Sequence, residues 1–168
     1  MRASLLCFAL AVGLLLVMPT VASYAQASPR DAVPAELAAG TLGGAVVGGG
    51  TAYLAAAICA ADADGWEALA CIAYGALGYV VGLPIGTTVG VHIAGAAWGV
   101  DGNTLLSVLG AIGGEAGGLL ITSGLGALQD DPPEAFQVLA FLGLTPLASS
   151  AGATWGFNVG ATLSRNSE

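Results

Sequence analysis

The chain has 168 residues, of which 56% are hydrophobic and only 8% are charged, with a net charge of −8. In an average soluble domain about a quarter of the residues are charged, so this composition favours a membrane protein. Lysine is absent, which excludes a P-loop nucleotide site because that motif needs a lysine at the phosphates. The acidic balance argues against nucleic-acid binding, in which lysine and arginine neutralise phosphates.

The N-terminus has the features of a secretory signal peptide. Arg2 precedes an apolar run from Leu5 to Met18, and Ala25 and Ala27 fit the small-residue cleavage site that follows such a run. We therefore expect a signal peptide over residues 1–27 and a single helical membrane domain over residues 28–168. An uncleaved signal anchor is the alternative.

Four apolar segments follow, separated by short polar turns. They cover residues 37–61, 67–99, 104–128 and 134–163, and a helix as long as the shortest of them can cross the ~30 Å hydrocarbon core of a bilayer. Short turns predict antiparallel neighbours, so we expect an all-α fold, a compact membrane bundle of about four helices. Interior prolines remove backbone hydrogen bonds, which predicts a kink at Pro84 and a break in the last helix at Pro146.

Glycines recur every four residues in each of these segments. Positions four apart lie on one face of a helix, and small residues let membrane helices approach one another closely. We therefore expect these glycines to pack helix against helix. The set comprises Gly40, Gly44, Gly48, Gly78, Gly82, Gly86, Gly90, Gly110, Gly114, Gly118, Gly152, Gly156 and Gly160.

A spacing of four is also a multiple of two, so strands of a transmembrane β-barrel are the alternative fold. Val81, Leu83 and Ile85 alternate with small residues, as strands of such a barrel do. Two features favour helices instead. Alanine is abundant and disfavours strands, and the apolar runs are longer than the ~10 residues of a barrel strand.

Cys59 and Cys71 lie almost symmetrically about the turn between the first two segments, so a helical hairpin would place them opposite each other. Export permits oxidation, and we expect a disulfide, with two buried thiols as the alternative. If the first helix spans an inner membrane after signal cleavage, this turn faces the reducing cytoplasm. Three solutions stay open: no disulfide, a hairpin that does not span, or a location that is oxidising on both sides.

His92 is the only histidine, and Glu115 is the only acidic residue inside the third segment. An antiparallel hairpin would place them about one helical turn apart, and intramembrane ionisable residues often handle protons or ions. They are therefore a possible intramembrane polar pair. The alternative is that His92 makes a hydrogen bond between helices and that Glu115 faces a polar seam or the surface.

The glycine steps, following a signal sequence, resemble the glycine-zipper proteins of bacterial envelopes. The resemblance covers about residues 40–160 and rests on spacing and composition. It implies a small membrane-associated packing or assembly component and carries over no catalytic residue. The acidic turns and the absence of lysine differ from the basic, membrane-disrupting members of that group.

We therefore expect a non-enzymatic protein of a bacterial cell-envelope membrane, inner or outer, with a structural or assembly role. Its expected partners are the lipid membrane and either further copies of itself or a membrane complex. We expect no cofactor and no metal, since one histidine and two separated cysteines are too few for a zinc site. The alternative function is a small channel or transporter that uses His92 and Glu115.

Overall fold

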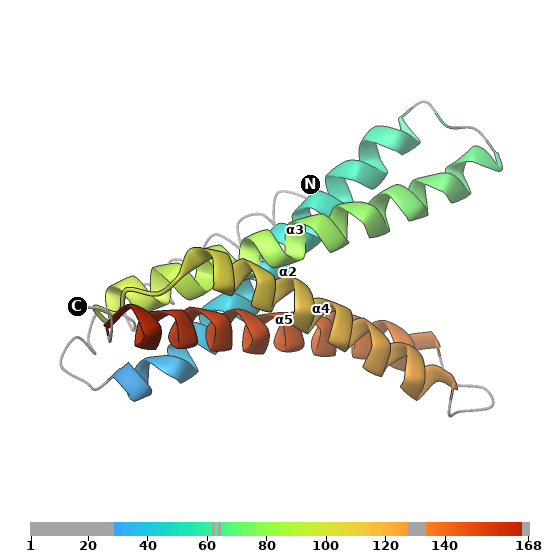
Figure 1. Cartoon of the computed structure of the whole chain (residues 1–168). Helices are drawn as coiled ribbons and strands as arrows, with labels where there is room; N and C mark the ends of the chain where they lie inside the picture. The colour runs from blue at the N-terminus through green and yellow to red at the C-terminus, as the bar shows by residue number, and fades with distance from the viewer. Residues whose placement is uncertain (1–28, 62, 64, 128–133, 166–168) are drawn as a thin grey trace.

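The computed structural model describes residues 29–61, 63, 65–127 and 134–165 and is shown in Figure 1. Its helices are α2 (Pro29–Ala60), α3 (Glu67–Ala97), α4 (Thr104–Ala127) and α5 (Glu134–Arg165). The predicted all-α fold is confirmed, and the β-barrel alternative is wrong, because the described residues contain no strand. The expected signal peptide, residues 1–27, lies outside the described part of the chain.

Local turn chemistry explains where α3 and α4 begin and end. Gly65 and Gly99 have positive φ angles of 58° and 68°, a conformation that residues with a Cβ rarely adopt. The side-chain oxygen of Asn103 accepts a hydrogen bond from the backbone N–H of Leu106 at 3.1 Å, as a helix N-cap does. These residues set the turns that the sequence predicted.

Neither interior proline interrupts its helix, although the sequence predicts a break at Pro146. Pro84 lies inside α3 and Pro146 lies inside α5, and both helices continue through them. The expected break at Pro146 is therefore wrong. Pro146 is fully buried, and packing by neighbouring helices is what allows membrane helices to tolerate an interior proline. The first helix extends beyond the apolar segment of residues 37–61, because α2 begins at Pro29 and so includes Glu36.

The helices form two hairpins, α2 with α3 and α4 with α5, and contacts within each hairpin far outnumber those between the hairpins. Figure 1 shows that the hairpins lie together at the end near the α3–α4 connection and diverge toward their own turns. The divergent end of the first hairpin is exposed, as Tyr53 and Ile58 show. The bundle is therefore packed at one end and open at the other.

Glycines bring the backbones of α2 and α3 into contact. A Cβ placed on Gly86 would overlap the carbonyl oxygen of Gly43 and lie 2.6 Å from the Cβ of Val47, and a Cβ on Gly90 would overlap the carbonyl oxygen of Ala39. At such a short separation the hydroxyl of Thr51 reaches across to the carbonyl of Gly78, at 2.6 Å. Glycine thus permits both the close approach and the hydrogen bond between the two helices.

The second hairpin uses the same arrangement. A Cβ on Gly110 would overlap the carbonyl oxygen of Gly152, and a Cβ on Gly152 would overlap that of Gly110. Gly114 faces the carbonyl of Ala148, and Gly156 faces that of Leu106. The two helix backbones therefore touch along α4 and α5 without intervening side chains.

The buried apolar core is small and lies where the hairpins meet. It consists of Ala32, Val91, Val100, Ala111, Ala153 and Phe157, with Trp98 packed against it. Many large apolar side chains lie on the outside instead, among them Leu120 and Trp155. Three stretches are long and apolar enough to cross a membrane: Ala32–Ala60, Leu69–Ala97 and Thr104–Ala127. The apolar exterior and these spans indicate a membrane protein.

The structure contains the predicted disulfide between Cys59 and Cys71, whose Cα atoms are 5.3 Å apart. It joins the end of α2 to the first turns of α3, at the divergent tip of the first hairpin (Figure 1).

We predict that Gly86→Ala lowers the free energy of unfolding by about 1–3 kcal/mol, because the new methyl group would collide with the backbone of α2. Gly50→Ala is the matched control, since a Cβ at Gly50 would meet no atom within 4 Å. That change should be neutral or stabilise the protein by up to ~1 kcal/mol through its helix propensity. Unfolding by denaturing detergent, followed by tryptophan fluorescence, measures both. Equal stabilities of the two variants would contradict the close contact.

Candidate functional site

The interior of the bundle contains an unusual number of polar side chains. The buried polar or charged residues are Glu36, Thr87, Thr88, Ser107, Glu115, Thr145, Ser149, Ser150 and Thr154. Four of them, Thr145, Ser149, Ser150 and Thr154, lie on α5, at spacings that place them on one side of the helix. A row of polar groups therefore runs along the face of α5 that points into the bundle.

Two serines of this row connect α5 to the other three helices. The hydroxyl of Ser149 donates to the carbonyl of Ala111 on α4 at 3.1 Å and lies 3.4 Å from the hydroxyl of Thr87 on α3. The hydroxyl of Ser150 donates to the carbonyl of Leu37 on α2 at 2.7 Å. Since few contacts join the two hairpins, these hydrogen bonds are a substantial part of what holds them together.

Glu36 is an acidic residue that the sequence-based reasoning did not select. Its side chain is fully buried, and its Oε2 accepts a hydrogen bond of 2.6 Å from the side-chain amide of Asn158 on α5. It lies one position before the apolar segment that begins at residue 37, and only acidic residues inside such segments were considered. An acidic residue at the edge of an apolar segment was the available signal.

Glu115 lies in the middle of α4, and only 4% of its surface is exposed. It belongs to the buried face of that helix together with Ser107, Ala111 and Gly118. Its Oε1 has no hydrogen-bond partner among the described residues. The phenol of Tyr79 on α3 is within electrostatic range of this carboxyl group. Glu115 is therefore a carboxyl group in the apolar part of the bundle rather than on its surface.

His92 contacts the beginning of α4 and does not contact Glu115. Its Nδ1 lies 2.8 Å from the carbonyl oxygen of Thr88, so Nδ1 carries the proton, because a carbonyl can only accept. Its Nε2 then accepts from the hydroxyl of Thr104 at 3.1 Å. The imidazole also packs edge-on against Phe157, with ring centroids 4.8 Å apart. His92 thus links α3, α4 and α5.

The structure does not bring the predicted polar pair together. Thr104, the residue that His92 contacts, precedes Glu115 by eleven positions, which is about 16 Å along a helix. The prediction assumed that α3 and α4 pack antiparallel along their whole length. Instead α3 packs mainly along α2 and α4 mainly along α5, and His92 lies opposite Thr104 at the start of α4.

The predicted packing glycines lie almost entirely inside the two hairpins. Those of α2 and α3 face each other, and those of α4 face α5. Gly40 and Gly44 lie closest to side chains of other helices. A Cβ on Gly40, for example, would lie 2.6 Å from the hydroxyl of Ser150 on α5. Gly160 lies on α5, but its surroundings are outside the described residues. The regular glycine spacing therefore serves contacts within this chain.

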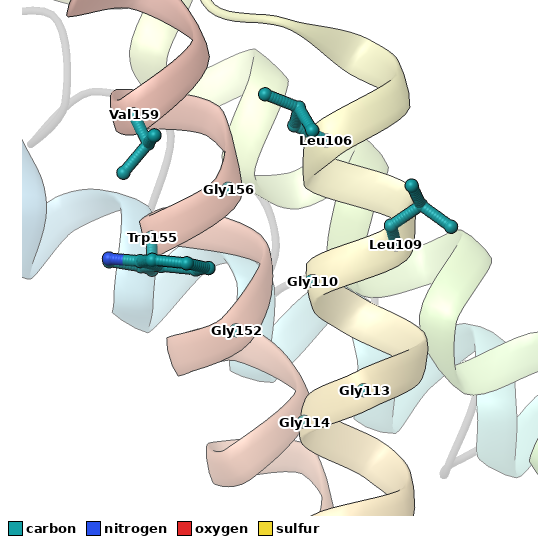
Figure 2. Close-up of a pocket in the computed structure, with 9 residues that line it drawn as sticks. All are labelled: Leu106, Leu109, Gly110, Gly113, Gly114, Gly152, Trp155, Gly156 and Val159. Atoms are coloured by element: carbon teal, nitrogen blue, oxygen red, sulfur yellow. The ribbon is translucent and has the colours of Figure 1, made fainter.

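A groove on the outer side of the second hairpin leaves one further glycine, Gly113, open. Its volume is about 420 Å³, and Figure 2 shows α4 and α5 forming its two sides. Glycines form its floor, and leucine, valine and tryptophan side chains form its walls. The lining residues are Leu106, Leu109, Gly110, Gly113, Gly114, Gly152, Trp155, Gly156 and Val159. The spacing of glycines along the chain predicts the four-residue rows but not this groove, because the groove depends on how two helices are placed relative to each other.

Comparison of the chain with models of protein families, with curated proteins and with solved structures finds no match. The resemblance to glycine-zipper proteins therefore stays a prediction. The groove and the polar interior are the features of the molecule that bear on its function.

We predict that His92→Ala and Glu115→Gln have additive effects on the free energy of unfolding, within about 0.5 kcal/mol, because distant sites without shared partners do not couple. His92→Ala and Thr104→Val form the matched control pair and should couple by about 0.5–1.5 kcal/mol, the net value of a hydrogen bond. Both double-mutant cycles can be measured by detergent unfolding. A coupling between His92 and Glu115 as large as that of the control pair would contradict the separation described above.

Proposed function

We propose that this chain is a non-enzymatic structural protein of a membrane that self-associates through the groove between α4 and α5. The observation that carries the proposal is the groove itself, with its glycine floor and apolar walls on a membrane-facing surface. The proposed role requires no catalytic group. Export and a bacterial envelope location, on the model of the glycine-zipper proteins that the chain resembles, are part of the same proposal.

The association surface differs from the one that the glycine spacing first suggested. The regular glycine rows are occupied by contacts inside the hairpins, so they offer little to a partner. Gly113 differs from them, because a Cβ placed there would meet no atom within 4 Å. It is one of the residues that line the groove, so this surface remains available after the chain has folded.

A second copy of the same chain is the occupant that the groove favours. Its lining contains no charged side chain, so an occupant within a membrane has to be apolar, and small residues favour a helix backbone. Trp155 stands at its edge with 70% of its surface exposed. In a two-fold symmetric contact the same patch serves both subunits, so the wall side chains of each copy can fill the groove of the other.

A small channel or transporter is the second candidate, and the row of polar side chains inside the bundle favours it. Polar groups inside a membrane protein commonly mark ion or proton pathways. It ranks second because Ser149 and Ser150 donate their hydrogen bonds to backbone carbonyls of neighbouring helices. Those hydroxyls close the bundle rather than line an open path. Ion flux into liposomes containing the purified protein would favour this candidate.

We predict that Gly113→Leu reduces self-association at least tenfold, because the leucine would occupy the groove, and its Cβ would meet no atom of its own chain within 4 Å. Gly50→Leu is the matched control on α2, since a Cβ at Gly50 also meets no atom within 4 Å. Sedimentation equilibrium in detergent micelles measures the association constants, and circular dichroism checks that the helices are retained.

Two results would contradict this proposal. The first is a wild-type protein that stays monomeric in micelles and in native membranes. The second is an equal loss of association in the two leucine variants, which would mean that the effect is not specific to the groove. Cross-linking in native membranes to a different protein through a cysteine at position 113 would replace self-association with a place in a larger complex.

A further inference from the structure

Three buried polar groups from three different helices come together around the middle of α4. They are Tyr79 of α3, Glu115 of α4 and Thr145 of α5, each at most 5% exposed. The phenol oxygen of Tyr79, Oε1 of Glu115 and Oγ1 of Thr145 all lack hydrogen-bond partners among the described residues. Buried polar atoms are nearly always satisfied, so three such atoms in one region call for a ligand.

The contacts between helices place Thr145 beside Glu115. A Cβ on Gly114 would lie 3.0 Å from the Cα of Ser149, and a Cβ on Gly118 would lie 3.1 Å from the Cα of Thr145. Glu115 lies between these two glycines and shares the buried face of α4 with Gly118. Its side chain is therefore at the level of α5 where Thr145 and Ser149 point inward.

Tyr79 reaches the same level from α3. Its ring packs against Phe141, one turn before Thr145 on α5, with ring centroids 5.1 Å apart. It interacts electrostatically with the carboxyl group of Glu115. Tyr79 also shares the buried face of α3 with Leu83 and Thr87, and the hydroxyl of Thr87 lies 3.4 Å from that of Ser149 on α5.

Thr145 differs from other threonines in these helices. Thr41, Thr88 and Thr122 each donate their hydroxyl to the carbonyl four residues earlier in their own helix. Such back-bonding is the usual arrangement in an apolar helix. The hydroxyl of Thr145 has no such bond, so it is available to a group outside its own helix.

Lysine and arginine are absent from the long stretch of sequence that surrounds Glu115. The arginines are Arg2, Arg30 and Arg165, and no lysine or arginine occurs between residues 31 and 164. An unpaired carboxylate inside a membrane is costly. A small cation from the solvent is the remaining way to neutralise it.

We propose that Glu115, Tyr79 and Thr145 form a proton-binding site in the interior of the membrane. A proton from the aqueous phase forms an O–H bond with the carboxylate, and no other reactant takes part. A hydroxyl group can donate or accept. The hydroxyls of Tyr79 and Thr145 have no partner among the described residues; in the proposed site they turn toward Glu115 and donate to the carboxylate when the proton leaves.

Among the groups around this site, Glu115 is the acidic one. From α3 the titratable group that faces it is Tyr79, and α5 contributes the hydroxyls of Thr145 and Ser149. The buried acid of α2, Glu36, is bonded to Asn158, which follows Thr145 by thirteen residues, about 20 Å along a helix. Glu36 is thus a second carboxyl group at a separate place.

A hydrophobic carbodiimide tests the proposal, because it reacts with protonated carboxyl groups inside membranes. We expect dicyclohexylcarbodiimide to modify Glu115 in the full-length protein in liposomes, as located by peptide mass spectrometry. Above the pH of half-maximal labelling the rate should fall about tenfold per pH unit, since one proton is bound at one site. Glu115→Gln should abolish labelling of that peptide, while Glu36→Gln, the matched control, should leave it unchanged.

A separate variant tests the role of the Tyr79 and Thr145 hydroxyls. Combining Tyr79→Phe with Thr145→Val should raise the pH of half-maximal labelling by at least about one unit, since hydrogen bonds donated to a carboxylate favour its charged form. Circular dichroism and tryptophan fluorescence verify that each variant is folded. An unchanged pH profile in the folded double variant would overturn the assignment of these hydroxyls.

Three further outcomes would overturn the proposal itself. One is the absence of labelling at Glu115 at any pH, and another is labelling that does not depend on pH between about 5 and 10, a range that covers buried carboxyl groups. The third is protection by sodium at constant pH and ionic strength, because the bound cation would then be Na⁺ rather than a proton. None of these outcomes depends on self-association through the outer groove.

Discussion

Helix backbones touch in both hairpins, and glycine makes that contact possible. A glycine inside a helix costs roughly 0.5–1 kcal/mol relative to alanine, and this chain contains 27 glycines. In a lipid environment no hydrophobic effect drives helices together, so packing and hydrogen bonds between helices have to provide the stabilisation. The contacts of Gly86 with Gly43 and of Gly110 with Gly152 show how that is done. The side chain is removed at the point where the other backbone passes.

The close approach also determines which polar side chains can act between helices. Serine and threonine hydroxyls are short, and they reach a neighbouring backbone only when the helices nearly touch. Thr51 reaches the carbonyl of Gly78 in this way, and Ser150 reaches that of Leu37 beside Gly40. Packing glycines and interior hydroxyls are therefore two parts of one arrangement. A substitution that separates the helices would break these hydrogen bonds as well.

The sequence was sufficient for the features that depend on neighbouring residues. Helical segments, their turns at Gly65 and Asn103 and the Cys59–Cys71 pairing follow from local patterns, and the structure contains them. Features that depend on how the two hairpins pack together could not be predicted from these local patterns. The pairing of His92 with Glu115 assumed that consecutive helices pack along their full length. The roles of Thr145 and Tyr79 needed the relative placement of α3, α4 and α5, which no spacing along the chain reveals.

The divergence of the two hairpins gives the molecule unequal ends. They lie together near the α3–α4 connection and separate toward the disulfide-linked tip of the first hairpin (Figure 1). Within a bilayer such a shape occupies more area in one leaflet than in the other, and acyl chains must enter the gap between the arms or the leaflet must spread around them.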